Sequence, residues 1–175
     1  MASKVLDATS FYAGIPFSSQ ETSFTTPFIF EEIKHIKKEQ DVINTLIESN
    51  RLKIIEPERE FVYRVQQKAN QTGDIQSLSK EDVSILALCL QLNGELVTDD
   101  FSILNVAKHL KLKVSPIMTK GIERIKDWIY FCSGCQKTFS KISQCPICGN
   151  KLKRRSAKSQ SSSYQSANEP SDTII

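Results

Sequence analysis

Two pairs of cysteines near the C-terminus constrain the fold of this chain more than any other feature. Cys132 and Cys135 lie in the segment CSGC, and Cys145 and Cys148 lie in CPIC after nine intervening residues. Each CxxC turn aims two sulfur atoms at one point, so two turns complete the tetrahedral four-thiolate shell that is typical of structural zinc. A closed shell leaves no position for a water molecule, so we predict one structural zinc ion and not a catalytic one. Iron–sulfur ligation and paired disulfides are the alternatives.

The segment around these cysteines also has an uneven charge. Residues 128–168 carry seven Lys or Arg and no Asp or Glu, whereas the whole chain has a net charge of +3. This end of the chain should attract a polyanion such as a nucleic acid. A basic tail that only improves solubility is the alternative. Loops this short cannot form a core of their own, so zinc binding is expected to fold the module.

The N-terminal sequence argues against export or membrane insertion. The start MASKVLDATSF lacks the apolar core of a secretory signal. No segment approaches the run of about 18 apolar residues that a membrane span requires. We therefore expect no membrane partner and a cytoplasmic, reducing environment, where clustered cysteines favour metal over disulfides.

The first 118 residues are expected to form an α/β domain. Segments with the apolar pattern of strands alternate with segments that have the helical pattern, which favours a parallel sheet between helical layers. Residues 14–25 are predicted to be a loop. The predicted strands are Lys4–Asp7, Leu52–Ile55, Glu95–Thr98 and Leu112–Pro116. After residue 118 we expect a linker over 119–127, a zinc ribbon over 128–152 and a basic, Ser-rich disordered tail over 153–175.

Several acids lie where α/β folds place their active sites, at the carboxyl ends of strands and on neighbouring helices. Most of them have a structural alternative: a helix cap, a first-turn acid that suits the helix dipole, or a solvated helix face. Asp7 is the exception, because it ends an apolar strand abruptly. Gathered carboxylates repel one another, and a divalent cation such as Mg²⁺ or Mn²⁺ offsets that repulsion. The candidates are Asp7, Glu31, Glu32, Asp82, Asp99 and Asp100.

Four stretches of this sequence resemble the PIN-domain nucleases: LDATSF, TPFIFEEIKH, GDIQSLSKEDVSILAL and LVTDDFSILNVAKHL. Followed directly by a four-cysteine ribbon, they resemble the Nob family of endoribonucleases, in its compact archaeal form. That family matures the 3′ end of small-subunit ribosomal RNA. The resemblance covers residues 3–152. It implies a PIN fold, with a central parallel sheet flanked by helices, and a single-stranded precursor ribosomal RNA substrate within the small-subunit precursor.

The resemblance also implies roles for individual residues. The family's catalytic acids fall on Asp7, Glu32, Asp82 and Asp100. Asp7 and Asp100 would hold Mg²⁺ or Mn²⁺ directly, while Glu32 and Asp82 would act through water. Thr9 matches the small hydroxyl residue that usually accompanies the first acid. Asp99 becomes a helix cap or an outer acid of the site.

In this interpretation the basic ribbon binds the RNA. Its aromatic residues either stack on bases or pack around the zinc site. Two other functions remain open at this point: a toxin-like PIN ribonuclease, and an assembly factor that binds RNA without cutting it. The proposed phosphate ligands are Lys137, Lys141, Lys151, Lys153, Arg154 and Arg155.

Overall fold

The computed structural model describes residues 3–34, 40–118, 128–139 and 144–156. Within them, residues up to 118 form an α/β domain around a five-stranded sheet, with the strand order β3-β2-β1-β4-β5 and parallel pairing throughout. The strands are β1 (Lys4–Leu6), β2 (Ser23–Thr25), β3 (Leu52–Ile54), β4 (Glu95–Val97) and β5 (Lys113–Ser115).

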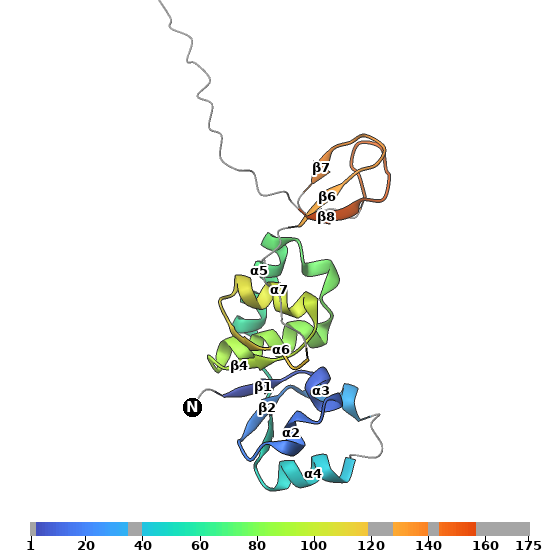
Figure 1. Ribbon diagram of the computed structural model, residues 1–175. Helices are drawn as coiled ribbons and strands as arrows, with labels where there is room; N and C mark the ends of the chain where they lie inside the picture. Colours follow the sequence, from blue (N-terminus) through green and yellow to red (C-terminus); the bar gives the residue numbers. More distant parts are fainter. Residues whose placement is uncertain (1–2, 35–39, 119–127, 140–143, 157–175) are drawn as a thin grey trace, which may run out of the picture.

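Helices cover both sides of this sheet. Figure 1 shows α5, α6 and α7 on one side of the strands, and α2 and α4 on the other. The helices are α1 (Ala8–Tyr12), α2 (Ile15–Ser18), α3 (Pro27–Ile33), α4 (Gln40–Glu48), α5 (Arg59–Thr72), α6 (Lys80–Gln91) and α7 (Phe101–His109), with a short 3₁₀ helix η1 (Ile75–Ser77) before α6. The predicted parallel sheet between helical layers is therefore confirmed.

Helix α6 forms the centre of the core. Its residues from Val83 to Cys89 are all buried, as the apolar sequence of this helix predicts. Ser79 caps its first turn through a capping box with Asp82. Cys89 is a fully buried core residue, and burial raises the pKa of its thiol to about 12. The thiol therefore stays protonated at neutral pH. Cys89 is a core residue and not a nucleophile.

The predicted loop over 14–25 is wrong in part, because it contains α2 and β2. The side chains that β2 turns into the core are polar: Ser23 is 3% exposed and Thr25 is fully buried. The Thr25 hydroxyl is satisfied by donating to the carbonyl of Leu6, 2.9 Å away. A strand that buries hydroxyl groups in place of apolar groups lacks the alternation by which strands are recognised.

The cysteine-containing module is a three-stranded antiparallel sheet with the order β7-β6-β8. Its strands are β6 (Trp128–Phe131), β7 (Thr138–Phe139) and β8 (Lys153–Ser156). The tail predicted to begin at residue 153 is therefore corrected, because Lys153–Ser156 pairs with β6 along its whole length. None of the helices in the described part of the chain is long and apolar enough to cross a membrane.

Candidate active site and metal centre

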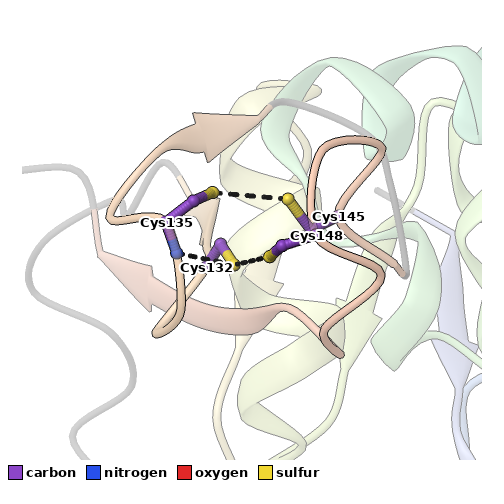
Figure 2. A group of neighbouring side chains, drawn as sticks. All are labelled: Cys132, Cys135, Cys145 and Cys148. Carbon is purple, nitrogen blue, oxygen red and sulfur yellow. Dashed lines mark hydrogen bonds between the residues drawn. The ribbon is translucent and has the colours of Figure 1, made fainter.

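The four cysteines converge as the sequence predicts. Figure 2 shows their side chains turned toward one another from two loops. The sulfurs of Cys132 and Cys148 lie 3.4 Å apart, as do those of Cys135 and Cys145. All four lie within 4.8 Å of one another. A tetrahedral zinc site with bonds of ~2.3 Å places its sulfurs ~3.8 Å apart, so the set fits zinc.

The two loops are built as the same turn. In the first, the amide of Gln136 donates to the carbonyl of Cys132, at 3.0 Å, and in the second that of Gly149 donates to Cys145, at 2.9 Å. Gln136 and Gly149 both adopt left-handed backbone angles, with φ of 64° and 72°. The turn thus reverses the chain after the second cysteine of each pair and leaves both sulfurs on one side.

Backbone amides prepare two of the thiols for metal binding. The amide of Cys135 lowers the pKa of the Cys132 thiol. Burial opposes ionisation of Cys145, but the amides of Cys148 and Ile147, together with the thiols of Cys135 and Cys148, outweigh it and bring its pKa to about 6. Thiolates are the form that ligates metal, so Cys132 and Cys145 are the ligands that ionise more readily, whereas burial and the neighbouring sulfurs raise the pKa values of Cys135 and Cys148.

The four predicted catalytic acids line a single cavity of about 630 Å³. They come from separate elements: Asp7 follows β1, Glu32 lies on α3, Asp82 lies in the first turn of α6, and Asp100 caps α7. The cavity lies where the carboxyl ends of the parallel strands meet, which is where α/β folds bind ligands. Its wall also includes Thr9, Tyr12, Phe28, Glu31, Ser79 and Glu81.

Asp7 is the most deeply placed of the acids that line the cavity, with 4% of its surface exposed. One oxygen of its carboxylate accepts hydrogen bonds from Thr98, at 2.8 Å, and from Thr9, at 3.1 Å. The same Thr98 hydroxyl accepts a bond from the amide of Asp100, at 3.1 Å. Thr98 therefore connects the first and last acids of the site, because β1 and β4 are neighbours in the sheet.

Thr98 is the residue of this site that the sequence alone did not assign. In the sequence it is only the last residue of the predicted strand Glu95–Thr98. A threonine at the end of a strand is ordinary, and its hydroxyl meets Asp7 only because of the sheet order. The predicted supporting role of Thr9 agrees with its hydrogen bond to Asp7.

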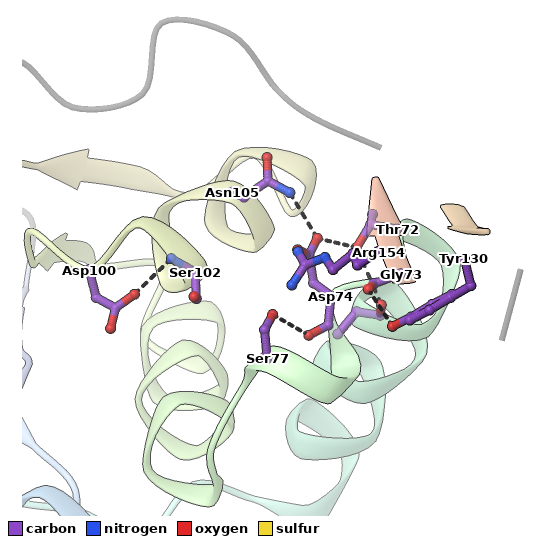
Figure 3. A network of polar contacts seen from close by, with 10 residues as sticks. Thr72, Gly73, Asp74, Ser77, Asp100, Ser102, Asn105, Tyr130 and Arg154 are labelled. Atoms are coloured by element: carbon purple, nitrogen blue, oxygen red, sulfur yellow. Dashed lines mark hydrogen bonds and ion pairs between the residues drawn. The ribbon is translucent and has the colours of Figure 1, made fainter. Parts of the chain in front are cut away.

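Of the two neighbouring acids at the start of α7, Asp100 lines the cavity as predicted, but Asp99 is not the helix cap. Asp100, not Asp99, is the N-cap, and it accepts a bond from the amide of Ser102 at 2.7 Å (Figure 3). Asp99 accepts the amides of Ile117 and Met118, at 3.0 and 2.8 Å, and fixes the segment after β5. Asp99 does not line the acid cavity.

Burial and neighbouring charges raise the pKa values of three acids of the cavity, Asp7, Glu32 and Asp82. Burial raises the pKa of Asp7, and the charge on Asp100 adds to this, although the hydroxyls of Thr98 and Thr9 oppose it. Burial also raises the pKa values of Glu32 and Asp82, each of which is raised further by Asp7. A divalent cation in the cavity would relieve this repulsion.

The arrangement of the carboxylates suits a hydrated cation. Among the residues that the structure describes, only the four cysteines bring three or more candidate ligand atoms within 4.8 Å of one another. The acids instead surround the cavity. Mg²⁺ commonly takes one or two carboxylates directly and keeps several waters, so this donor set fits such an ion.

Comparison with known proteins identifies the family. Residues 5–92 match the family model described as the PIN domain of ribonuclease. The Nob1 endoribonuclease of Methanocaldococcus jannaschii is 37% identical over 91% of this chain and 81% of its own length. That of Pyrococcus abyssi is 34% identical over 85% of this chain and 91% of its own length.

The chain belongs to the Nob1 family of PIN-domain endoribonucleases. Ribonuclease VapC1 of Thermoplasma acidophilum is 40% identical, but over 63% of this chain and 57% of that protein. The two Nob1 relatives above match over much more of the chain, so the toxin-like PIN ribonuclease is not the favoured alternative.

The basic residues of this Nob1 ribbon do not all face solvent. Lys137, Lys151, Lys153 and Arg155 are exposed, and the Arg155 guanidinium lies 4.5 Å from the ring centre of Phe131. Lys141 lies outside the described residues. Arg154 was predicted to bind phosphate, but it forms an ion pair with Asp74 of the α/β domain.

That ion pair belongs to a joint between the two modules (Figure 3). Asp74 is fully buried, and it also accepts bonds from Thr72, at 2.7 Å, and Asn105, at 2.8 Å. The Tyr130 hydroxyl donates to the carbonyl of Gly73, at 3.1 Å. Arg154 and Tyr130 are paired across β6 and β8, so both point from the same face of the ribbon sheet. Neither is placed to bind RNA in this arrangement.

Gly73 allows the modules to approach closely. It ends α5 with a φ of +77°, and a Cβ atom at this position would lie 2.6 Å from the carbonyl oxygen of Trp128. The Trp128 ring in turn lies 4.1 Å from the Arg154 guanidinium. The ribbon of this Nob1 family member is therefore docked on the α/β domain through backbone, aromatic and charged contacts.

Proposed function

We propose that the chain cuts single-stranded precursor ribosomal RNA at the 3′ end of the small-subunit RNA, in the cytoplasm and within the small-subunit precursor. The observation that carries this proposal is the convergence of four acids from four elements on one cavity. Membership of the Nob1 family supports the choice of RNA as the substrate.

Asp7 and Asp100 would hold a Mg²⁺ or Mn²⁺ ion directly, and Glu32 and Asp82 would contact it through water. Such an ion, when bound, supplies positive charge to the phosphate and makes an attacking water more acidic. Glu32 is exposed in the cavity wall, so it is placed to orient that water. Thr98 and Thr9 keep the Asp7 carboxylate facing the cavity.

The reaction is a hydrolysis of one phosphodiester bond. The oxygen of the water attacks phosphorus, the bond to the 3′ oxygen breaks, and that oxygen takes up a proton. The products are a 5′-phosphate and a 3′-hydroxyl end. No cysteine or histidine nucleophile is required, which agrees with the buried, protonated state of Cys89.

The ribbon would hold the RNA while the α/β domain cuts it. Lys137, Lys151, Lys153 and Arg155 offer exposed positive charge. Zinc has a structural role here, because four thiolates fill its coordination shell. Arg154 is removed from the proposed set of phosphate ligands, because it pairs with Asp74.

The test is cleavage of an RNA fragment that spans the 3′ end of the mature small-subunit RNA. Zinc-loaded protein would be incubated with Mn²⁺, with Mg²⁺ or with EDTA, and the ends of the products mapped. We expect metal-dependent cleavage at that end, lost in Asp7→Asn and Asp100→Asn while RNA binding persists. Cleavage elsewhere, or cleavage that EDTA leaves unchanged, would refute the proposal. Mn²⁺ titration separates this enzyme from an RNA-binding assembly factor, which would bind no second metal.

A further inference from the structure

An apolar groove opens beside the acid cavity. It has a volume of about 530 Å³ and lies between α5, the segment around η1 and the start of α6. Val62, Ile75 and Val83 contribute its apolar surface. Phe28 and Ser79 line both the groove and the acid cavity, so the two are continuous.

Two aromatic rings in the groove are open to solvent. Tyr63 is 59% exposed and Phe28 is 41% exposed, although both are large side chains. Exposed rings in a groove are the platforms on which single-stranded nucleic acids stack their bases.

The charge of the groove differs from that of its neighbour. The acid cavity is lined by six carboxylates and no Lys or Arg. The groove is lined by Arg59 and Lys80, at the starts of α5 and α6, against one acid, Glu56. A phosphate chain that leaves the acid cavity past Phe28 therefore meets positive charge and an aromatic ring together.

We propose that this groove is a nucleotide subsite for the part of the RNA next to the cleaved bond. One base stacks on Tyr63, and Arg59 and Lys80 contact phosphates. Phe28 lies at the boundary between the groove and the acid cavity. The volume suits one nucleotide, since small-ligand pockets range over about 300–1,000 Å³. The inference rests on the proposed ribonuclease function and extends it to the residues that position the strand.

The test measures RNA affinity and cleavage separately, with the full zinc-loaded chain. Affinity is measured by anisotropy of a fluorescein-labelled single-stranded RNA without added Mg²⁺ or Mn²⁺. The variants are Tyr63→Ala and Arg59→Ala. The controls are Tyr63→Phe, which keeps the ring, and Arg64→Ala, which removes a charge from the same helix outside the groove lining.

We expect Tyr63→Ala and Arg59→Ala to weaken binding about tenfold, in the range found for loss of one stacked base or one charged contact. Tyr63→Phe and Arg64→Ala should stay within about twofold of the wild type. The mutated side chains are exposed, so the variants should fold normally, and thermal melting verifies this.

An abasic scan of the RNA then locates the contact. Removing the base that stacks on Tyr63 should weaken binding to the wild type but have no further effect on Tyr63→Ala, because the two changes remove the same interaction. Equal effects of the abasic site in both proteins would overturn the inference.

The outcomes separate this inference from the proposed function. If Asp7→Asn abolishes cleavage but the Tyr63 and Arg59 variants bind like the Arg64 control, the enzyme assignment stands and the groove inference falls. The groove would then suit a protein segment. If the wild type cuts no RNA but Tyr63 and the abasic site are coupled, the subsite stands and the assigned reaction falls.

Discussion

The buried environment of Asp7 disfavours the ionised form of its carboxyl group. Its pKa is raised first by burial and then by Asp100, and only partly lowered by Thr98 and Thr9. The Asp7 carboxyl therefore binds a proton more tightly in the folded state than in the unfolded chain. The folded state is penalised at neutral pH, and the penalty shrinks as the pH falls from the raised pKa of the folded state to the lower pKa of the unfolded chain.

We predict that Asp7→Asn stabilises the metal-free protein while it abolishes cleavage. Removing one of several mutually repelling carboxylates should add about 1 kcal/mol to the free energy of unfolding, or ~2–4 °C in Tm at neutral pH. The advantage over wild type should shrink as the pH is lowered. Thermal melting across pH checks this. A lower Tm at neutral pH would mean that the hydrogen bonds from Thr98 and Thr9 outweigh the repulsion.

Glu31 and Glu32 offer a matched comparison on one helix. Both line the cavity, but Glu31 pairs with Lys34, whereas the pKa of Glu32 is raised by burial, Asp7, Glu81 and Asp82. We predict that Glu32→Gln lowers kcat at least about a hundredfold, as expected for loss of a group that acts in the transition state. Glu31→Gln should lower it by less than about threefold. Equal losses would show that the wrong glutamate has been assigned.

At this scale the sequence was informative where local chemistry was unusual. An acid directly after an apolar strand marked Asp7, and a cysteine pair marked each metal-binding turn. Thr98 and the partner of Arg154 could not be found this way, because both depend on which distant segments become neighbours.

At the scale of elements, helix starts were the easiest features to predict. The sequences Thr26-Pro27 and Ser79-Lys80-Glu81-Asp82 are typical of helix starts, and Thr26 and Ser79 do cap α3 and α6, since each accepts a backbone amide of its own helix. Strand β2 was missed because its buried side chains are hydroxyls. The strand order could not be predicted from the sequence either, because several parallel arrangements have the same alternation of strands and helices along the chain.

The capping box of α6 connects stability with the active site. Asp82 accepts the amide of Ser79, at 2.8 Å, and its own amide donates to the Ser79 hydroxyl, at 3.1 Å. We predict that Ser79→Ala destabilises the protein by about 1 kcal/mol and also slows cleavage, because Asp82 is less well held. Ser79→Thr should restore both. Denaturant unfolding and single-turnover cleavage measure the two effects. A loss of stability without slower cleavage would mean that Asp82 needs no such support.

At the scale of the whole molecule, the two modules contact each other at the Asp74 joint. Arg154 and Arg155 are adjacent on β8, but Arg154 is paired with buried Asp74, while Arg155 lies over Phe131. Their sequence, Arg-Arg in a basic segment, gives no sign of this difference.

We predict opposite effects for substitutions at these two positions. Arg154→Ala leaves Asp74 buried without its ion pair, so it should cost roughly 2–4 kcal/mol and release the ribbon. Arg155→Ala should leave docking intact and weaken RNA binding severalfold. Small-angle scattering and RNA titration distinguish the two. If Arg154→Ala stays compact and loses RNA affinity, Arg154 is a phosphate ligand after all.

The docked ribbon also provides an optical probe. Trp128 is the only tryptophan in the chain, and it lies at the joint, against Gly73 and the Arg154 guanidinium. Light absorbed near 295 nm is therefore emitted from the one place where the two modules meet. Removal of zinc, undocking of the ribbon or arrival of an RNA that separates the modules should each change that emission in an unlabelled protein.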